Sequence, residues 1–233
     1  MNFKKMFLPL VGMVLCIASY AQNADEVITK YLTAKGGADN LRKIETLVMK
    51  GNLNINGLQI PVTMKMVNNG GMRVDFTFNG MSGFQIITKD AGWDFNPFSG
   101  QTKPEPLTAE DVKSKQDALD IRDDLLDYAS KGTSVEYLGI EDVEGTECHK
   151  LLLTLSGGKQ KTYFIDADGF MLVKSSEKTT VNGQETESNT MYSNYKMVGD
   201  IMFAHNIASD MGPIEMESIE INTPIDNSAF KPE

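Results

Sequence analysis

Three consecutive segments alternate apolar and polar residues almost without exception, and this pattern constrains the fold more than any other feature of the chain. The segments are 46–55, 58–66 and 72–79. Because successive side chains of a strand point to opposite faces, each segment predicts a strand with one apolar and one polar face. The apolar positions are Leu47, Met49, Leu53, Ile55, Leu58, Ile60, Val62, Met64, Met66, Met72, Val74, Phe76 and Phe78.

The joints between these segments are Asn56-Gly57 and Asn69-Gly70-Gly71. Asparagine and glycine tolerate the positive φ values of tight hairpins, so the three strands are expected to form an antiparallel meander. An antiparallel sheet with one apolar face must cover that face. What covers it is the functional question that this sequence poses.

The N-terminus has the three parts of a secretory signal. Lys4 and Lys5 precede an apolar stretch at 6–18, and small residues stand at 19 and 21. The stretch is too short to span a bilayer comfortably. We therefore expect residues 1–21 to be a cleaved signal peptide and residues 22–233 to form one exported domain, in the periplasm of a Gram-negative cell.

Lipid modification is not expected, because Cys16 follows Leu15 rather than a small residue. Loss of Lys4 and Lys5 changes the net charge from −10 to −12, which disfavours nucleic acid and anionic membrane surfaces as partners. Cys148 is the one cysteine left after cleavage, so no intramolecular disulfide is possible.

The rest of the chain predicts two helices among many strands. Asn23 is a candidate N-cap for a helix with a Val27, Ile28, Tyr31 and Leu32 stripe that Gly36-Gly37 ends. A second helix is expected from Thr108 to about Ser130. Turn signals 10 to 15 residues apart then predict further antiparallel strands. The expected fold class is mainly β (α+β): an open, strongly curved antiparallel barrel of about eleven strands, with helices over its concave apolar face.

Residues suited to catalysis are few. Cys148 and His149 are adjacent on a predicted strand, so their side chains should point to opposite faces and cannot form a nucleophile–base pair. His205 shares the apolar parity of Phe203 and is expected to be a satisfied core or cavity-edge group. We predict no enzymatic activity and no catalytic residue.

The sequence also lacks a complete metal-binding or cofactor-binding motif. The run Asp166-Ala-Asp-Gly169 resembles the start of a calcium loop, but apolar residues replace the later ligands, and the run predicts a hairpin turn. His and Cys residues have no zinc spacing, and the glycine pairs lack a phosphate-loop pattern. No metal and no cofactor are expected.

Methionine is abundant, with eleven of the fourteen in the mature chain. Its flexible thioether suits surfaces that accept varied apolar partners, although ordinary core filling is the simpler interpretation. Taken with the sheet and with export, the methionines favour a lipid-accepting cavity.

The C-terminal half carries motifs of a known family. Lys161-Thr-Tyr-Phe-Ile-Asp166 followed by Gly169-Phe-Met-Leu-Val-Lys174 resembles the "Tyr-x-Ile-Asp … Gly-x-Leu-x-Lys" hairpin of LolA/LolB-like outer-membrane lipoprotein carriers. The close of the chain, from Asn222 through Ile225-Asp226 to Phe230, is similar to the family's "Asn-x-x-Ile-Asp-x-x-x-Phe" ending. The resemblance spans nearly the whole mature chain. The order of these short motifs indicates that the chain resembles a divergent member of this family.

The resemblance implies an open barrel of about eleven strands with helices as a lid over an apolar cavity. It also implies carriage of lipoprotein acyl chains between membrane-anchored donor and acceptor proteins, without catalysis, as a monomer. An arginine–proline pair stands before the third strand in classical carriers, whereas this chain has 66–72 there, with Arg73 on the polar parity. A relative that carries another lipid is equally allowed.

Two hypotheses of different class follow. The first is a periplasmic carrier or chaperone for lipoprotein acyl chains or another hydrophobic ligand. The second is a structural or interaction module of the cell envelope whose sheet is filled by its own side chains. For the carrier, the expected cavity residues are Leu58, Ile60, Val62, Met64, Met66, Met72, Val74, Phe76, Phe78, Leu125, Tyr128, Phe203 and His205.

Overall fold

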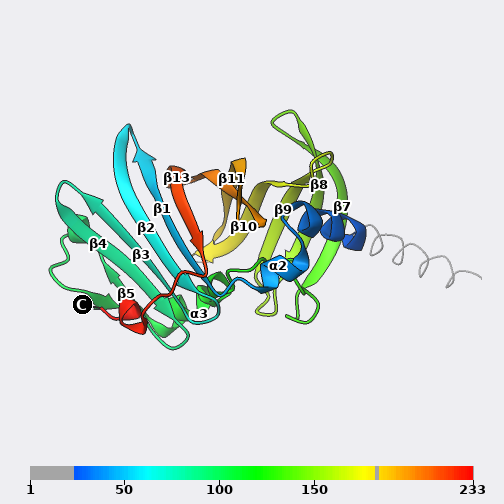
Figure 1. Cartoon of the computed structure of the whole chain (residues 1–233). Helices are drawn as coiled ribbons and strands as arrows, with labels where there is room; N and C mark the ends of the chain where they lie inside the picture. The colour runs from blue at the N-terminus through cyan, green and yellow to red at the C-terminus, as the bar shows by residue number, and fades with distance from the viewer. Residues whose placement is uncertain (1–23, 182–183, 233) are drawn as a thin grey trace, which may run out of the picture. The chain divides into compact units, whose positions relative to one another are not determined.

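The computed structural model describes residues 24–181 and 184–232 (Figure 1). The predicted signal peptide, the Asn23 N-cap and the turn at Asn182-Gly183 lie outside the described residues. No helix in the described part of the chain is long and apolar enough to cross a membrane.

The chain divides into two compact units. Among the described residues, one comprises 24–34, 127–181 and 184–188, and the other comprises 35–126 and 189–232. We call them the smaller and the larger unit. Strand β11 (Gln184–Val198) begins in the former and ends in the latter.

The larger unit is built on an antiparallel sheet with the strand order β6-β5-β4-β3-β2-β1-β13-β12-β11. The three alternating segments are its strands β1, β2 and β3, as predicted. Asn56 and Gly57 have φ values of 51° and 84°, which is the left-handed pair that a two-residue hairpin turn requires. The strand bounds are β1 (Thr46–Ile55), β2 (Leu58–Val67), β3 (Gly71–Phe78), β4 (Met81–Thr88), β5 (Gly92–Phe95), β6 (Glu105–Pro106), β12 (Ile201–Ser209) and β13 (Gly212–Ile221).

The long helix expected from Thr108 to Ser130 does not form. Thr108 caps a short helix, α3 (Ala109–Ser114), through a hydrogen bond from the Asp111 amide to its Oγ1 atom (3.1 Å). A 3₁₀ turn, η2 (Gln116–Leu119), follows, and hydrogen-bonded turns continue to residue 132. The helix is interrupted locally by aspartate side chains that bond to nearby backbone amides.

Two aspartates accept hydrogen bonds from amides two residues ahead, and such side-chain bonds compete with a helix. The Oδ1 of Asp120 accepts from the Arg122 amide (3.2 Å), and the Oδ1 of Asp123 accepts from the Leu125 amide (2.9 Å). Asp123 and Asp127 also have positive φ values, which no α-helix contains. The periodic apolar residues that suggested a helix are therefore carried by turns.

The C-terminal segment of the larger unit packs on its sheet. It contains the 3₁₀ turn η3 (Asn227–Phe230), where Asp226 caps the Ser228 amide. Phe230 is buried in a cluster with Phe84 and Ile86, and its ring atoms lie 3.0 Å from the position that a Cβ on Gly71 would occupy. Phe230 therefore anchors the C-terminal segment to the sheet.

The smaller unit combines a helix with an antiparallel sheet of order β10-β9-β8-β7. The helix covers residues 24–34 and buries Val27, Ile28 and Tyr31, as the apolar stripe predicted. The sheet buries Leu151, Leu153 and Ile165 completely. Its strands are β7 (Ser134–Val143), β8 (Thr146–Thr154), β9 (Gln160–Asp166) and β10 (Leu172–Val181).

The mainly β, antiparallel fold class is confirmed, and the strand order is linear, so the sheet is open. The strand count is thirteen in the described residues rather than about eleven. One extra strand is the two-residue β6, which forms where a Pro-rich loop passes beside β5. The other arises because the six turns after Ser134 separate seven segments, β7 to β13.

Candidate functional site

Cross-strand register places the predicted cavity residues of β2 and β3 on one face. Val62 lies opposite Phe76, Met64 opposite Val74, and Met66 opposite Met72. Strand alternation adds the remaining members, Leu58, Ile60 and Phe78. All nine predicted residues on these two strands therefore share one face, which we call the apolar face.

The apolar face continues onto strands on both sides. Leu53 of β1 lies opposite Ile60 of β2 and opposite Ile214 of β13. Ile214 in turn lies opposite Ile207 of β12. Phe203 and His205 of β12 have the parity of Ile207, so they are on the apolar face as well, a relation that only long-range strand pairing could reveal.

His205 is buried, and its Nδ1 atom lies 3.1 Å from the carbonyl oxygen of Phe203. The predicted cavity residues Leu125 and Tyr128 belong to different units. Leu125 is completely buried in the larger unit, whereas Tyr128 belongs to the smaller unit, where its hydroxyl donates to the Oδ1 of Asp25 (2.7 Å). Both stay predicted ligand contacts.

Burial of the apolar face changes along the strands. Ile87, Leu47 and Val62 are buried, but towards the hairpin tips Ile55, Leu58 and Met81 are 37%, 50% and 46% exposed. The Asn56-Gly57 and Asn79-Gly80 turns stand at the same end of the sheet because β1 to β4 form a meander. This end therefore presents large apolar side chains to solvent.

Phe98 is a member of this exposed end that the sequence analysis missed. It lies in the 3₁₀ turn η1 (Pro97–Ser99), and its ring centroid is 6.3 Å from that of Phe76 and 5.8 Å from that of Phe78. The Asn96 side chain accepts from the Phe98 amide (3.1 Å) and sets the turn. Local sequence predicts such a turn, but not which face its phenylalanine covers.

The opposite end of the strands is closed by the segment that contains α3 and η2. The Asn69 amide donates to the Leu119 carbonyl (2.7 Å), and the Gln116 amide side chain donates to the Thr88 carbonyl (3.0 Å). The Nε of Arg122 donates to the Ile44 carbonyl (2.9 Å). Leu119 is buried there, so the apolar face is covered at one end and exposed at the other.

The Cys148 and His149 pair lies in the smaller unit, on β8, as predicted. Cys148 is buried, and burial, with the charges of Asp166 and Asp142, raises the pKa of its thiol to about 11. The reactive thiolate is therefore scarce at neutral pH. Neighbouring strand positions project to opposite faces, which separates this thiol from the His149 ring.

His149 is part of a stacked cluster instead. Its ring lies 5.6 Å from the Phe170 ring, its Nδ1 atom lies 3.2 Å from the Tyr137 hydroxyl, and the Lys30 ammonium lies 5.1 Å from the Phe170 ring. Burial lowers the pKa of His149, and the positive charge of Lys30 lowers it further. These contacts pack the imidazole between the Tyr137 and Phe170 rings.

We expect the His149 cluster to make stability depend on pH. Because its pKa is lower in the folded than in the unfolded state, the unfolded chain binds the proton more readily, and the free energy of unfolding falls as the pH drops below about 6.5. Urea unfolding between neutral and mildly acidic pH measures this. His149→Gln should flatten the profile; an unchanged slope in this variant would assign the dependence to other groups.

Metal-binding potential is low in the described residues, which contain no cluster of three or more His, Cys, Asp or Glu side chains able to hold an ion. The Asp166–Gly169 run forms the hairpin turn that was predicted, with the Asp168 amide donating to the Oδ1 of Asp166 (3.0 Å). The Phe170 amide donates to the Asp166 carbonyl (3.0 Å). The turn uses its carboxylate to bind its own backbone.

Comparison with known proteins supports the expected resemblance at the level of the fold. The chain is similar to the crystal structure of a LolA superfamily protein from Nitrosomonas europaea, with a TM-score of 0.52, 13% sequence identity, and coverage of 89% of this chain and 97% of that chain. It is similar to a DUF1329 family protein from Desulfovibrio piger, with a TM-score of 0.51, 11% identity, and coverage of 89% and 96%. No family model and no curated protein matches the sequence.

Proposed function

We propose that this protein is a non-catalytic periplasmic carrier that binds lipoprotein acyl chains, or another lipid, on the apolar face. The observation that carries the proposal is a continuous apolar face on β1 to β4, β12 and β13 whose hairpin end exposes Ile55, Leu58 and Met81. Exposed patches of large apolar side chains are more typical of binding sites than of the rest of a protein surface.

The fold supports the same class of function, since a LolA superfamily protein shares it. In the proposed working form, the sheet curves into an open barrel, its concave side holds the ligand, and Leu125 and Tyr128 belong to the lid. The cleaved signal peptide exports the chain, and membrane-anchored donor and acceptor proteins load and unload the monomer.

Burial of methylene groups is the proposed source of affinity. Each buried methylene contributes about 0.8 kcal/mol, so a chain of about twelve methylenes gains roughly 10 kcal/mol before the cost of ordering it. Methionines at 49, 64, 66 and 72 line the face, and their flexible side chains can adjust to acyl chains of different length.

Native mass spectrometry of the exported protein, purified without detergent, tests the proposal. We expect mass additions that organic extraction identifies as acyl-bearing lipids, and saturable binding of N-phenyl-1-naphthylamine, a neutral fluorescent apolar probe. A protein that carries no lipid and does not bind the probe would favour the alternative, an envelope module whose sheet is filled by its own side chains.

A further inference from the structure

The face of the sheet opposite the apolar face carries an unusual group of cations. Lys65 of β2 lies directly opposite Arg73 of β3, and Lys50 of β1 lies opposite Thr63 of β2. Like charges directly across two strands are destabilising. These cations lie together although the chain as a whole has a net charge of −10, so their clustering requires an explanation.

Nearby carboxylates do not neutralise the two lysines. Three carboxylates line the pocket: Asp75 binds the Nε of Arg73 (2.7 Å), Glu220 accepts from the Thr223 hydroxyl (3.1 Å), and Asp226 accepts from the Ser228 amide (2.7 Å). Neither the Lys50 nor the Lys65 ammonium makes a hydrogen bond or ion pair with the side chains described, those of residues 24–178 and 186–232. Two positive charges are thus left without a protein partner.

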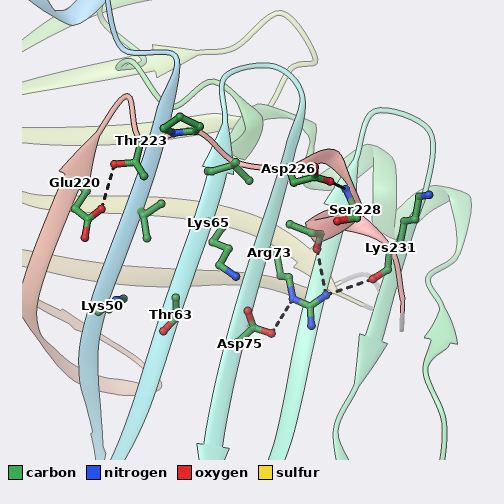
Figure 2. Close-up of a pocket in the computed structure, with 14 residues that line it drawn as sticks. Lys50, Thr63, Lys65, Arg73, Asp75, Glu220, Thr223, Asp226, Ser228 and Lys231 are labelled. Carbon is green, nitrogen blue, oxygen red and sulfur yellow. Dashed lines mark hydrogen bonds and ion pairs between the residues drawn. The ribbon is translucent and has the colours of Figure 1, made fainter.

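These lysines line an open pocket on this face of the sheet, where Lys50 is exposed and Lys65 is half-buried. The C-terminal segment from Thr223 to Lys231 forms its second wall, and the pocket volume is about 830 Å³. Figure 2 shows Lys65, Arg73 and Thr63 on the strands, with Asp226 and Ser228 in the segment that crosses them. The pocket is built by a segment that lies far from β1 to β3 in the sequence.

Specific contacts hold that wall in place. The Nη1 of Arg73 donates to the Ala229 carbonyl (3.1 Å) and to the Lys231 carbonyl (3.3 Å), and its guanidinium lies 4.5 Å from the Phe84 ring. Phe230 is buried in the same cluster. Arg73 therefore anchors the wall and leaves the lysines to meet a ligand.

We propose that this pocket binds the phosphate group of a small organic phosphate, held by the ammonium groups of Lys50 and Lys65 and by the Thr63 hydroxyl. Ammonium groups form strong charge-assisted hydrogen bonds to phosphate oxygens. The volume exceeds that of a bare phosphate, and Val48, Pro224 and Ile225 in its lining offer apolar contacts to an organic substituent. The phosphate can belong to a soluble ester or to a phospholipid headgroup, and either source is distinct from acyl binding on the apolar face.

Isothermal titration calorimetry at low ionic strength, with inorganic phosphate and with glycerol 3-phosphate, tests the soluble source. Co-sedimentation with phosphatidylglycerol vesicles tests the headgroup. Lys50→Gln with Lys65→Gln should weaken whichever binding occurs at least about tenfold, because each lysine contributes a charge-assisted bond.

The matched control is Lys89→Gln with Lys103→Gln. These lysines are exposed and outside the pocket, so the control removes the same charge and should change the affinity by less than about twofold. Binding in the soluble arm or in the vesicle arm that depends on Lys50 and Lys65 supports the site and identifies its source. Absence of binding in both arms, or an equal loss in the control, overturns it.

Discussion

The double substitution Leu58→Asp, Met81→Asp is expected to weaken binding of N-phenyl-1-naphthylamine at least about tenfold. Both side chains lie at the exposed end of the apolar face, 50% and 46% exposed. A bound apolar ligand would remove their carboxylates from water, which costs a few kcal/mol for a charged group without a partner. The probe is neutral, so simple charge repulsion cannot account for a loss.

Adjacent residues on the same strands supply the control. Gln59 and Ser82 are exposed and follow Leu58 and Met81 directly, so they point to the opposite face. Gln59→Asp with Ser82→Asp adds the same charge and should leave probe affinity within about twofold. Stability should change little in either double variant, by about 0.5 kcal/mol per site, because all four positions are on the surface.

Fluorescence titration measures probe affinity, and native mass spectrometry then compares the carried lipid in the two variants. A loss confined to the Leu58 and Met81 pair supports ligand binding on the apolar face. Equal affinity in both variants would place the probe elsewhere and contradict the carrier proposal.

The substitution Gly36→Ala is expected to destabilise the larger unit by about 3–5 kcal/mol. Gly36 has a φ of +119°, and a Cβ there would lie 2.0 Å from the carbonyl oxygen of Asp200. The backbone conformation alone costs about 1–3 kcal/mol for a residue other than glycine. The clash adds to this because the neighbour is backbone, close to the hydrogen bond from the Met202 amide to the Lys35 carbonyl (2.9 Å).

Gly37→Ala separates the two causes. Gly37 has a φ of +93° but nothing within 4 Å of its would-be Cβ, so only the conformational cost of about 1–3 kcal/mol applies. Gly157→Ala should be nearly neutral, because Gly157 lies outside the left-handed region of φ and its would-be Cβ meets open space. Urea unfolding measures all three, and an equal loss in Gly36→Ala and Gly37→Ala would show that the chain at Asp200 moves aside without cost.

Alternation was enough to predict the strands of the larger unit that carry the proposed site. Strand periodicity is a local property, so β1, β2 and β3 and their shared apolar parity followed from the order of residues alone. The helix of residues 24–34 followed for the same reason, with its stripe bounded by glycine. The resemblance in motif order also predicted the fold that a LolA superfamily protein shares.

The segment after Thr108 shows why periodicity can mislead. Its apolar spacing resembles a helix, but the side chains of Asp120 and Asp123 bond to nearby amides and turn the chain. Helix propensity does not account for this competition between side chains and the backbone. Whether the helix forms also depends on contacts with distant residues, such as that between Arg122 and the Ile44 carbonyl. The covering of the apolar face therefore could not be predicted from local sequence.

The sequence by itself determined which residues form strands and which side of each strand is apolar, because both depend on spacing along the chain. Only the tertiary structure decided which end of that apolar face is covered and that Phe98 extends its open end. It alone decided that the C-terminal segment crosses the polar face and forms an open pocket that Lys50 and Lys65 line. These relations join residues up to about 180 positions apart, and long-range strand pairing and packing, not local preference, set them.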